Sequence, residues 1–392
     1  MNALEVGQDR QVRGWLAVAS LAAGTFVMVT SEFLPIGLLT EIARDLHATN
    51  GAAGLMVTIP GLVAAIAAPL LVLVSGSLDR RYLLWLLSGL LVVSNLIVAT
   101  ASDLPVILLG RILLGISVGG FWGFGAALAG RLVAPDSGGR AVTIVFAGIS
   151  IGTVLGMPAG TLLGHAIGWR AVFICAAALS ALVLAGQILL LPRLPVLQSS
   201  GLKGLLSVFS ISQARVGLVC VVLVILGHFT AYTYITPFLE QRAGAPAALI
   251  SLILLAYGAA GFFGNLVGGA LVQRNVRTVL AGFSLLLAGA LIVLSVAGTG
   301  TISAAIFIII WGFAFGGLPI CLQTWLFRAA PETLASVSAV FVTVFQLAIA
   351  GGAFLGGVIV NGLGLSPAMA AGGITALAAA LVIRGFGESA TA

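Results

Sequence analysis

The sequence contains very few charged side chains: Asp, Glu, Lys and Arg together make up 7% of its 392 residues. Soluble proteins carry roughly 25% of these residues, whereas 60% of this chain is apolar. So few charges cannot cover a folded chain of this length in water, and apolar surface on that scale would aggregate unless lipid surrounded it. The scarcity of charge therefore excludes a soluble enzyme.

Reactive and metal-binding side chains are also scarce. The three cysteines, Cys175, Cys220 and Cys321, lie far apart in apolar runs, so we interpret them as small buried hydrophobic residues. Three histidines without clustered acids do not form the converging set of groups that a membrane enzyme needs. The only lysine, Lys203, lies in GLKGLL and not in a phosphate-binding loop, which argues against an ATP-driven pump. We expect no enzyme activity, no metal and no cofactor.

Long apolar runs occupy most of the chain. Because about 20 apolar residues cross the hydrocarbon core as a helix, we divide the sequence at its charged breaks into twelve spans, 15–40, 51–75, 82–101, 104–129, 141–165, 169–192, 216–239, 247–272, 278–297, 302–327, 334–360 and 366–384. The first run is too long for the core of a signal peptide, so we interpret it as a retained helix. The sequence predicts an all-α membrane protein with twelve transmembrane helices.

The seventeen Lys and Arg residues are divided unequally between the two sides of these spans. With the N-terminus inside, thirteen fall on the cytoplasmic side, namely Arg10, Arg13, Arg80, Arg81, Arg131, Arg140, Arg193, Lys203, Arg215, Arg274, Arg277, Arg328 and Arg384. Arg44, Arg170 and Arg242 fall outside, and Arg111 lies within a span. This asymmetry follows the positive-inside rule, so we expect both termini in the cytoplasm. The net charge of +6 then reflects topology, and nucleic acid is not an expected partner.

The chain also repeats itself. A connection at 193–215 separates an N-terminal half, 1–192, from a C-terminal half, 216–392, each with six spans. Gly115, Gly119 and Gly120 of the fourth span, with Arg131 at its end, recur at a constant offset as Gly312, Gly316 and Gly317 of the tenth, with Arg328 at its end. Six spans return the chain to the same side, so the halves are parallel, pseudo-symmetric repeats, as in major facilitator transporters.

Three phrases strengthen this resemblance: SEFLPIGLLTEIARDL (31–46), GRILLGISVGGFWG (110–123) and GWRAVF (168–173). They resemble the drug:proton antiporter branch of the major facilitator superfamily, most closely its bacterial efflux proteins for purine ribonucleosides and sugars. The resemblance implies a monomeric inner-membrane antiporter that exchanges protons for a small organic solute across the lipid bilayer by alternating access. Purine ribonucleosides, sugars and amphiphilic drugs are the candidate solutes. A proton symporter or uniporter that imports a nutrient, and a non-transporting membrane sensor, are the alternatives.

Glu32 is the only acid well inside a span, and Arg111 lies at similar depth in the fourth span, roughly 10 Å below the outer surface. Burial disfavours a charged carboxylate, so a carboxyl group at this position is a candidate for binding and releasing protons. The resemblance places the first and fourth helices around a central cavity, where Arg111 would favour the ionised form of Glu32. The alternatives are a hydrated structural network around Glu32 and a static Glu32–Arg111 ion pair.

A glycine ladder runs through the fifth span at four-residue spacing, formed by Gly148, Gly152, Gly156, Gly160 and Gly164, with Pro158 inside it. Such a stripe lets a neighbouring helix approach closely, and proline kinks a helix. The ladder resembles the antiporter motif of the family, although its register departs from Gly-Pro-x-x-Gly-Gly. Simple helix packing is the alternative interpretation.

The loop after the second span ends in Asp79, Arg80 and Arg81, and resembles a shortened form of the family's loop signature. The resemblance implies a latch that holds the halves together on the inner side in one conformation. The alternative is that these arginines serve only as an orientation signal.

Aromatic and polar side chains inside the spans are candidates for contact with the solute. Rings stack on planar solutes while a few polar groups fix their orientation. The predicted set is Trp122, His228, Phe229, Tyr232, Tyr234, Trp311, Phe315 and Gln346. His228 could titrate, although a hydrogen-bonded structural histidine is the alternative, and packing is the alternative for the aromatic residues.

Overall fold

The computed structural model describes residues 3–74, 76, 78–195 and 202–386, and helices make up the regular structure of these residues. Twelve of the described helical segments are long and apolar enough to cross a membrane. The predicted number of spans and the all-α fold are therefore confirmed. Residues 196–201 of the predicted connection lie outside the described residues, as do both chain ends.

Six spans form the N-terminal half. Its helices are α1 (Ala3–Gly37), α2 (Leu39–Asp45), α3 (Asn50–Ala53), α4 (Leu55–Val74), α5 (Arg80–Thr100), α6 (Leu104–Ala129), α7 (Gly138–Ile151), α8 (Met157–Ile167) and α9 (Trp169–Leu190). Helices α3 and α4 form one span, and α7 and α8 form another through a π-helical turn, Gly152–Gly156.

The other six spans form the C-terminal half. Its helices are α10 (Leu202–Ser207), α11 (Ser212–Tyr232), α12 (Ile235–Pro237), α13 (Ala247–Val272), α14 (Val276–Ala297), α15 (Thr301–Ala329), α16 (Leu334–Gly362) and α17 (Leu365–Phe386). A second π-helical turn, Phe238–Arg242, follows α12. The short α10 precedes the first span of this half and packs against α16.

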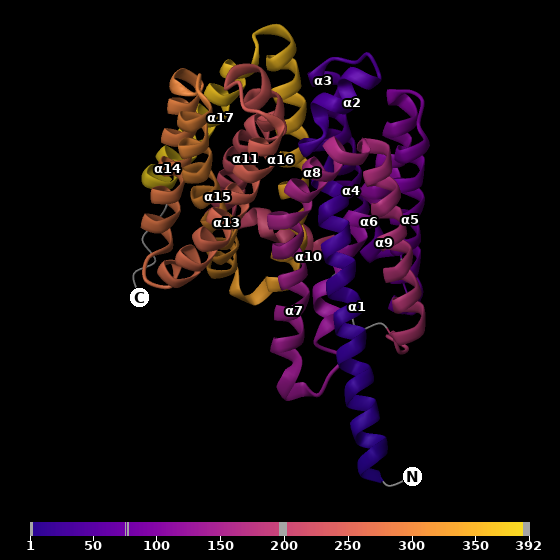
Figure 1. Cartoon of the computed structure of the whole chain (residues 1–392). Helices are drawn as coiled ribbons and strands as arrows, with labels where there is room; N and C mark the ends of the chain where they lie inside the picture. The colour runs from indigo at the N-terminus through magenta and orange to yellow at the C-terminus, as the bar shows by residue number, and fades with distance from the viewer. Residues whose placement is uncertain (1–2, 75, 77, 196–201, 387–392) are drawn as a thin grey trace.

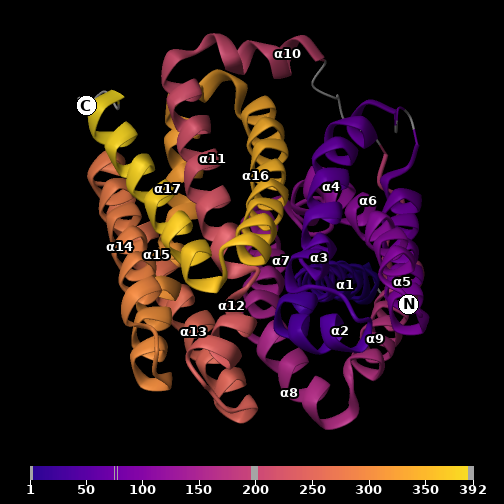
Figure 2. The ribbon, with the colours of Figure 1, turned by 90° about the horizontal axis from the view of Figure 1, so that it is seen from above.

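The two halves lie side by side, as Figure 2 shows. They meet where α4 packs on α16 and where α8 packs on α13. Helix α1 begins at one end of the bundle, and the short helices α2 and α3 lie at the other end (Figure 1). We call the end that carries α2 and α3 the α2–α3 face.

The repeated glycines serve the same purpose in each half. A Cβ atom at Gly119 would lie 2.6 Å from the carbonyl oxygen of Ala64, so α6 packs directly on the backbone of α4. At the corresponding Gly316, a Cβ atom would overlap the backbone of Gly261, so α15 packs in the same way on α13. The sequence repeat thus encodes one pair of close helix contacts twice.

The outside of the bundle carries large apolar side chains. Leu182 and Leu189 of α9 are 70% and 83% exposed, and Ile302 of α15 is 79% exposed. Lipid tails, unlike water, solvate such side chains without an energetic penalty. The surface therefore agrees with the membrane environment that the composition predicts.

Helix boundaries follow local sequence signals. Asp79, Asp103 and Asn275 cap α5, α6 and α14 by accepting hydrogen bonds from backbone N–H groups of the first turn. Between α8 and α9 the chain turns at Gly168, whose φ of 82° favours glycine. This glycine opens the GWRAVF phrase, so the phrase marks a tight turn between two spans.

Candidate functional site

Arg111 lies at the centre of the N-terminal half with none of its surface exposed. Its guanidinium donates three hydrogen bonds of 2.7 Å: Nε donates to the carbonyl oxygen of Met56, and the two terminal nitrogens donate to those of Ser31 and Glu32. These carbonyls belong to α1 and α4, while Arg111 belongs to α6. One side chain therefore ties three helices together at the depth of Glu32.

Glu32 is 4% exposed and faces the other half of the protein. Its Oε1 accepts a hydrogen bond of 3.3 Å from Nε2 of Gln346, which is 3% exposed and belongs to α16. This bond links the two halves directly. Both a carboxylate and a protonated carboxyl group can accept it, so the bond is compatible with either proton state.

Arg111 and Glu32 lie close together, but not as the ion pair considered from the sequence. In the described part of the chain, Arg170 forms an ion pair with Asp45 and His165 lies close to Glu41, but no ion pair joins Arg111 to the Glu32 carboxyl group. Arg111 instead binds the backbone carbonyl of Glu32. The arginine fixes the position of the backbone, and the carboxyl group stays available to Gln346.

The glycine ladder faces α1, the helix that carries Glu32. A Cβ atom at Gly152 would lie 2.9 Å from the carbonyl oxygen of Phe26, and one at Gly156 would lie 2.6 Å from Oγ1 of Thr30. Gly148 and Gly160 also contact α1, and Gly164 contacts Leu38, the residue after its end, so the contacts continue in four-residue steps. The ladder thus removes side chains along the whole contact with α1.

The span that carries the glycine ladder also contacts the C-terminal half. A Cβ atom at Gly258 of α13 would lie 2.9 Å from Cα of Val154, within the π-helical turn. Pro158 follows this turn, and proline has no N–H group with which to continue the helical hydrogen bonding. π-Helical turns are frequent at functional sites. The structure therefore places an irregular backbone segment between α1 and the C-terminal half.

We predict that Gly148→Ala destabilises the contact between α7 and α1 by about 1–3 kcal/mol, because the added Cβ would overlap the carbonyl oxygen of Ala22. Thermal unfolding in detergent measures this effect. The matched control is Gly139→Ala in the same helix, where a Cβ atom meets nothing within 4 Å. Equal unfolding temperatures of the two variants would contradict the importance of this contact.

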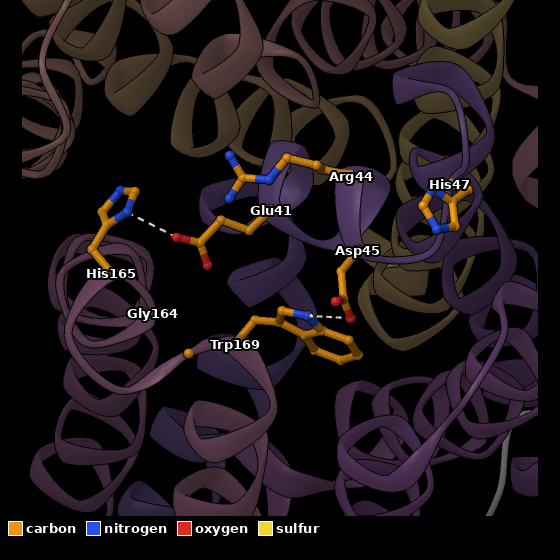
Figure 3. Close-up of a pocket in the computed structure, with 8 residues that line it drawn as sticks. Glu41, Arg44, Asp45, His47, Gly164, His165 and Trp169 are labelled. Carbon is orange, nitrogen blue, oxygen red and sulfur yellow. Dashed lines mark hydrogen bonds and ion pairs between the residues drawn. The ribbon is translucent and has the colours of Figure 1, made fainter.

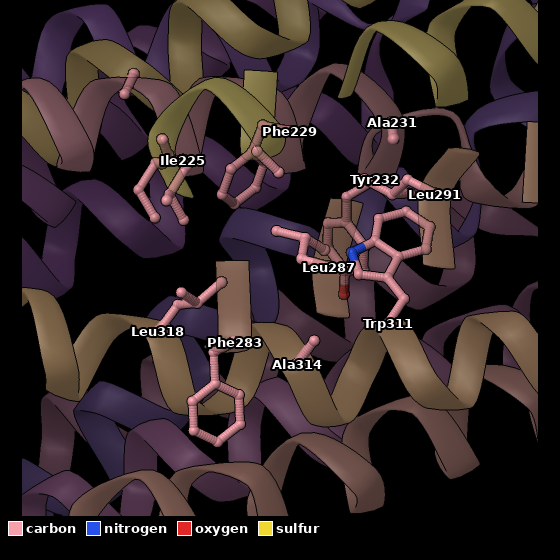
Figure 4. Packing of buried hydrophobic residues seen from close by; sticks show 14 of the residues in the cluster. Ile225, Phe229, Ala231, Tyr232, Phe283, Leu287, Leu291, Trp311, Ala314 and Leu318 are labelled. Atoms are coloured by element: carbon pink, nitrogen blue, oxygen red, sulfur yellow. The ribbon is translucent and has the colours of Figure 1, made fainter. Parts of the chain in front are cut away.

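An aromatic cluster occupies the interior of the C-terminal half (Figure 4). His228 stacks on Tyr232 with ring centroids 4.8 Å apart and on Phe315 at 3.3 Å. Its Nδ1 accepts a hydrogen bond of 3.0 Å from Nε1 of Trp311. Phe229 meets the His228 ring edge to face at 4.8 Å. The structure thus gathers five of the predicted solute-contact residues.

The cluster reaches the interface between the halves. Phe229 stacks on Phe33, the residue next to Glu32, with ring centroids 5.8 Å apart. The Tyr232 hydroxyl donates a hydrogen bond of 3.6 Å to the sulfur of Met157, which directly follows the π-helical turn. The aromatic cluster, Glu32 and the ladder therefore form one continuous region.

Two predicted solute-contact residues lie elsewhere. Trp122 is half-buried against the core of the N-terminal half and forms no ring contact with the aromatic cluster in the described part of the chain. Tyr234 is fully buried near the α2–α3 face, where its hydroxyl donates a hydrogen bond of 2.8 Å to the carbonyl oxygen of Ala353. A Cβ atom at Gly54 would overlap that hydroxyl. Tyr234 thus packs between the halves.

Asp79 and its neighbours contact their own half in this conformation. One carboxyl oxygen of Asp79 accepts hydrogen bonds of 2.9 Å from the backbone N–H groups of Arg81 and Leu194. Partial burial acts to raise the pKa of Asp79, but these hydrogen bonds outweigh it and hold the pKa below its usual value. Arg80 donates its backbone N–H to the carbonyl oxygen of Leu194, and the Arg81 guanidinium lies over Tyr82. The described contacts fasten the loop to the chain that follows α9.

A polar pocket of about 520 Å³ lies at the α2–α3 face (Figure 3). Nδ1 of His165 lies 2.8 Å from Oε1 of Glu41 on one side of it. On the other side, Asp45 accepts hydrogen bonds from Trp169 and Arg170. The bond from Arg170 lowers the pKa of Asp45. Residues of the phrases 31–46 and 168–173 thus meet in this pocket. Arg111, from the phrase 110–123, forms hydrogen bonds with the first of these.

Glu240 of the C-terminal half faces the same group of residues. Burial raises the pKa of Glu240, and the neighbouring Thr40 and His165 oppose this effect. Nearby, the backbone N–H of Gly51 donates a hydrogen bond of 3.2 Å to Oδ1 of Asn361. The described hydrogen bonds between the halves lie at the level of Glu32 or closer to the α2–α3 face. The halves are therefore joined at this face.

Sequence reasoning missed two residues of this region, Tyr257 and Asn95. Tyr257, one of four tyrosines in the chain, stacks on Tyr232 at 5.2 Å and meets Trp311 at 5.7 Å. Asn95 of α5 donates a hydrogen bond of 3.0 Å to Oγ of Ser31, beside Arg111 and Glu32. An intramembrane tyrosine or asparagine is a usable signal, but only the fold shows which partner it meets.

Comparisons with known proteins agree with this fold. Residues 21–353 match the family described as Major Facilitator Superfamily. The purine ribonucleoside efflux pump NepI of Shigella flexneri is 35% identical over 378 residues, covering 96% of each chain. The pump of the same name from Salmonella gallinarum is 35% identical over 369 residues, covering 94% of this chain and 93% of that protein.

A solved structure of a D-xylose-proton symporter has the same fold, with a TM-score of 0.77 at 16% sequence identity, covering 97% of this chain and 99% of that one. The relatives are transporters and not enzymes, so the predicted absence of enzyme activity agrees with the family. Both the sequence match and the twelve-span fold confirm the resemblance that the sequence motifs indicated. The chain belongs to the Major Facilitator Superfamily of membrane transporters.

Proposed function

We propose that the protein is a monomeric proton-coupled antiporter that exports a purine ribonucleoside or a closely related small solute. The observation that supports coupling is the position of Glu32, buried between the halves and hydrogen bonded to Gln346 of the opposite half. The efflux of purine ribonucleosides is inferred from relatives that are 35% identical over nearly the whole chain.

The proposed mechanism is alternating access of the two halves. The end at which α1 begins carries the excess of Lys and Arg, so in this proposal it faces the cytoplasm and the protein lies in a bacterial inner membrane. Both termini are then cytoplasmic. The α2–α3 face is then the outer face, and the contacts there close the protein on its outer side. Transport requires these contacts to separate so that Glu32 can exchange its proton with water outside.

Each described contact has a role in this cycle. Separation of the halves breaks the Glu32–Gln346 hydrogen bond and exposes the carboxyl group to water, which changes its affinity for a proton. Arg111 keeps the backbone of Glu32 attached to α4 and α6, so Glu32 moves with its own half. The glycine ladder lets α1 lie close to α7 and α8 at the moving interface. In the other conformation, Asp79, Arg80 and Arg81 would latch the inner side.

Flux measurements in liposomes test this proposal. With an acidic lumen and a neutral exterior, an antiporter should accumulate radiolabelled inosine, because inosine enters as protons leave. Arabinose and a cationic dye, assayed in parallel, test the other solute classes. A protonophore should abolish the accumulation.

The direction of the gradient separates antiport from the alternatives. Accumulation that requires an acidic exterior would show symport, and flux that is insensitive to either gradient would show a uniporter. Absence of flux for every solute would support a non-transporting protein. Each of these results would contradict proton-coupled export.

A further inference from the structure

The hydrogen bond between Trp311 and His228 fixes which imidazole nitrogen carries the proton. An indole N–H can only donate, so Nδ1 of His228, at 3.0 Å from Nε1 of Trp311, must be the unprotonated acceptor. The neutral imidazole then carries its hydrogen on Nε2. His228 is therefore a hydrogen-bond donor at Nε2.

This donor has no partner among the described residues. His228 is 1% exposed, and its Nε2 forms no hydrogen bond there. Buried polar groups in native proteins are nearly always hydrogen bonded, and an unmade bond to a buried N–H is unfavourable. An acceptor supplied by a bound solute would remove this penalty.

The surrounding rings fix the direction of the donor. Tyr232 and Phe315 stack on the imidazole, and Trp311 holds its Nδ1 edge. His228, Tyr232 and Trp311 are each no more than 4% exposed, whereas Phe315 is half-buried. A solute can therefore approach this cluster past Phe315 with less rearrangement than past the other rings.

We propose that the Nε2–H of His228 donates a hydrogen bond to a ring nitrogen of the transported purine base and selects for solutes that carry this acceptor. The inference rests on the proposed function and specifies which part of the solute the cluster recognises. Aromatic walls and a single free donor suit a flat base with an acceptor at its edge. A ribose or another sugar in the same place would bury several hydroxyl groups without partners.

The test compares inosine with 7-deazainosine and 3-deazainosine, each of which replaces one ring nitrogen by carbon. His228→Asn keeps an acceptor for Trp311 near the position of Nδ1 but removes the Nε2 donor, and His228→Gln returns an N–H group near Nε2. We expect His228→Asn to raise the KM for inosine about tenfold and His228→Gln to recover part of this loss.

The analogues separate recognition from packing. For one of them, the unaltered protein should show a similarly raised KM, and His228→Asn should have no further effect. If His228→Asn fails to fold, Trp311→Phe is the second variant, because it removes the indole donor to Nδ1. It should raise the KM for inosine by a larger factor than the KM for that same analogue.

Two results would overturn the inference. The first is an unchanged KM for inosine in His228→Asn. The second is a KM raised by the same factor for inosine and for both analogues, which is the behaviour of a packing residue. In both cases inosine transport by the unaltered protein preserves the proposed function. Absence of inosine flux in the unaltered protein would overturn the proposed function and, with it, this inference.

Discussion

Replacing Arg111 with lysine is expected to lower the transport rate about a hundredfold. The guanidinium donates to three backbone carbonyls at once, those of Met56, Ser31 and Glu32. An ammonium group cannot reproduce this fork. Each hydrogen bond from a charged donor contributes about 1.5–3 kcal/mol, so the loss of two weakens the arrangement by about 3 kcal/mol or more, which is about a hundredfold.

The measurement is proton-driven solute flux in liposomes, with thermal unfolding measured in parallel. The matched control is Arg131→Lys, because Arg131 lies just after the same helix, α6, and donates a solvent-exposed hydrogen bond to the carbonyl oxygen of Pro195. The control should retain most of its flux, since exposed bonds of this kind contribute little. Unaltered flux and pH dependence in Arg111→Lys would refute the role given to this arginine.

Most of the fold could be predicted because only apolar segments of sufficient length can cross the lipid bilayer as helices. Each span must be apolar over about 20 residues, so its charged flanks mark its ends. The prediction failed locally where polar or irregular turns continue an apolar run. The first span was predicted to reach 40, but α1 ends at Gly37 and a separate helix begins at Leu39. The seventh was predicted to reach 239, but α11 ends at Tyr232 and short helical turns follow through Pro237.

The candidate site was predictable in its members but not in its bonds. Glu32 and Arg111 could be placed at one depth because charges inside spans are rare. Their actual partners could not be predicted: Arg111 binds backbone carbonyls, which every residue possesses, and Glu32 binds an uncharged glutamine from the other half. Trp122 and Tyr234 could not be separated from the cluster by sequence, because an intramembrane aromatic residue has the same signal in a core as beside a solute.

Replacing Glu32 with glutamine is expected to abolish accumulation driven by a pH gradient while leaving solute exchange without a gradient largely intact. Glutamine has nearly the same shape as glutamic acid, and its amide oxygen can accept the hydrogen bond from Gln346. The backbone carbonyl that binds Arg111 is unaffected by the substitution. The variant therefore keeps the structure of the site and loses only the ability to bind and release a proton.

Two flux measurements on the same vesicles separate these abilities. Counterflow of labelled against unlabelled inosine reports solute binding and movement of the halves, and uptake under an acidic lumen reports coupling. In the control, Glu332→Gln, an exposed carboxyl group is neutralised, and both activities should persist. Loss of both activities in Glu32→Gln would indicate a structural carboxyl group. Normal accumulation would assign proton coupling to another residue, because an amide at this position cannot titrate.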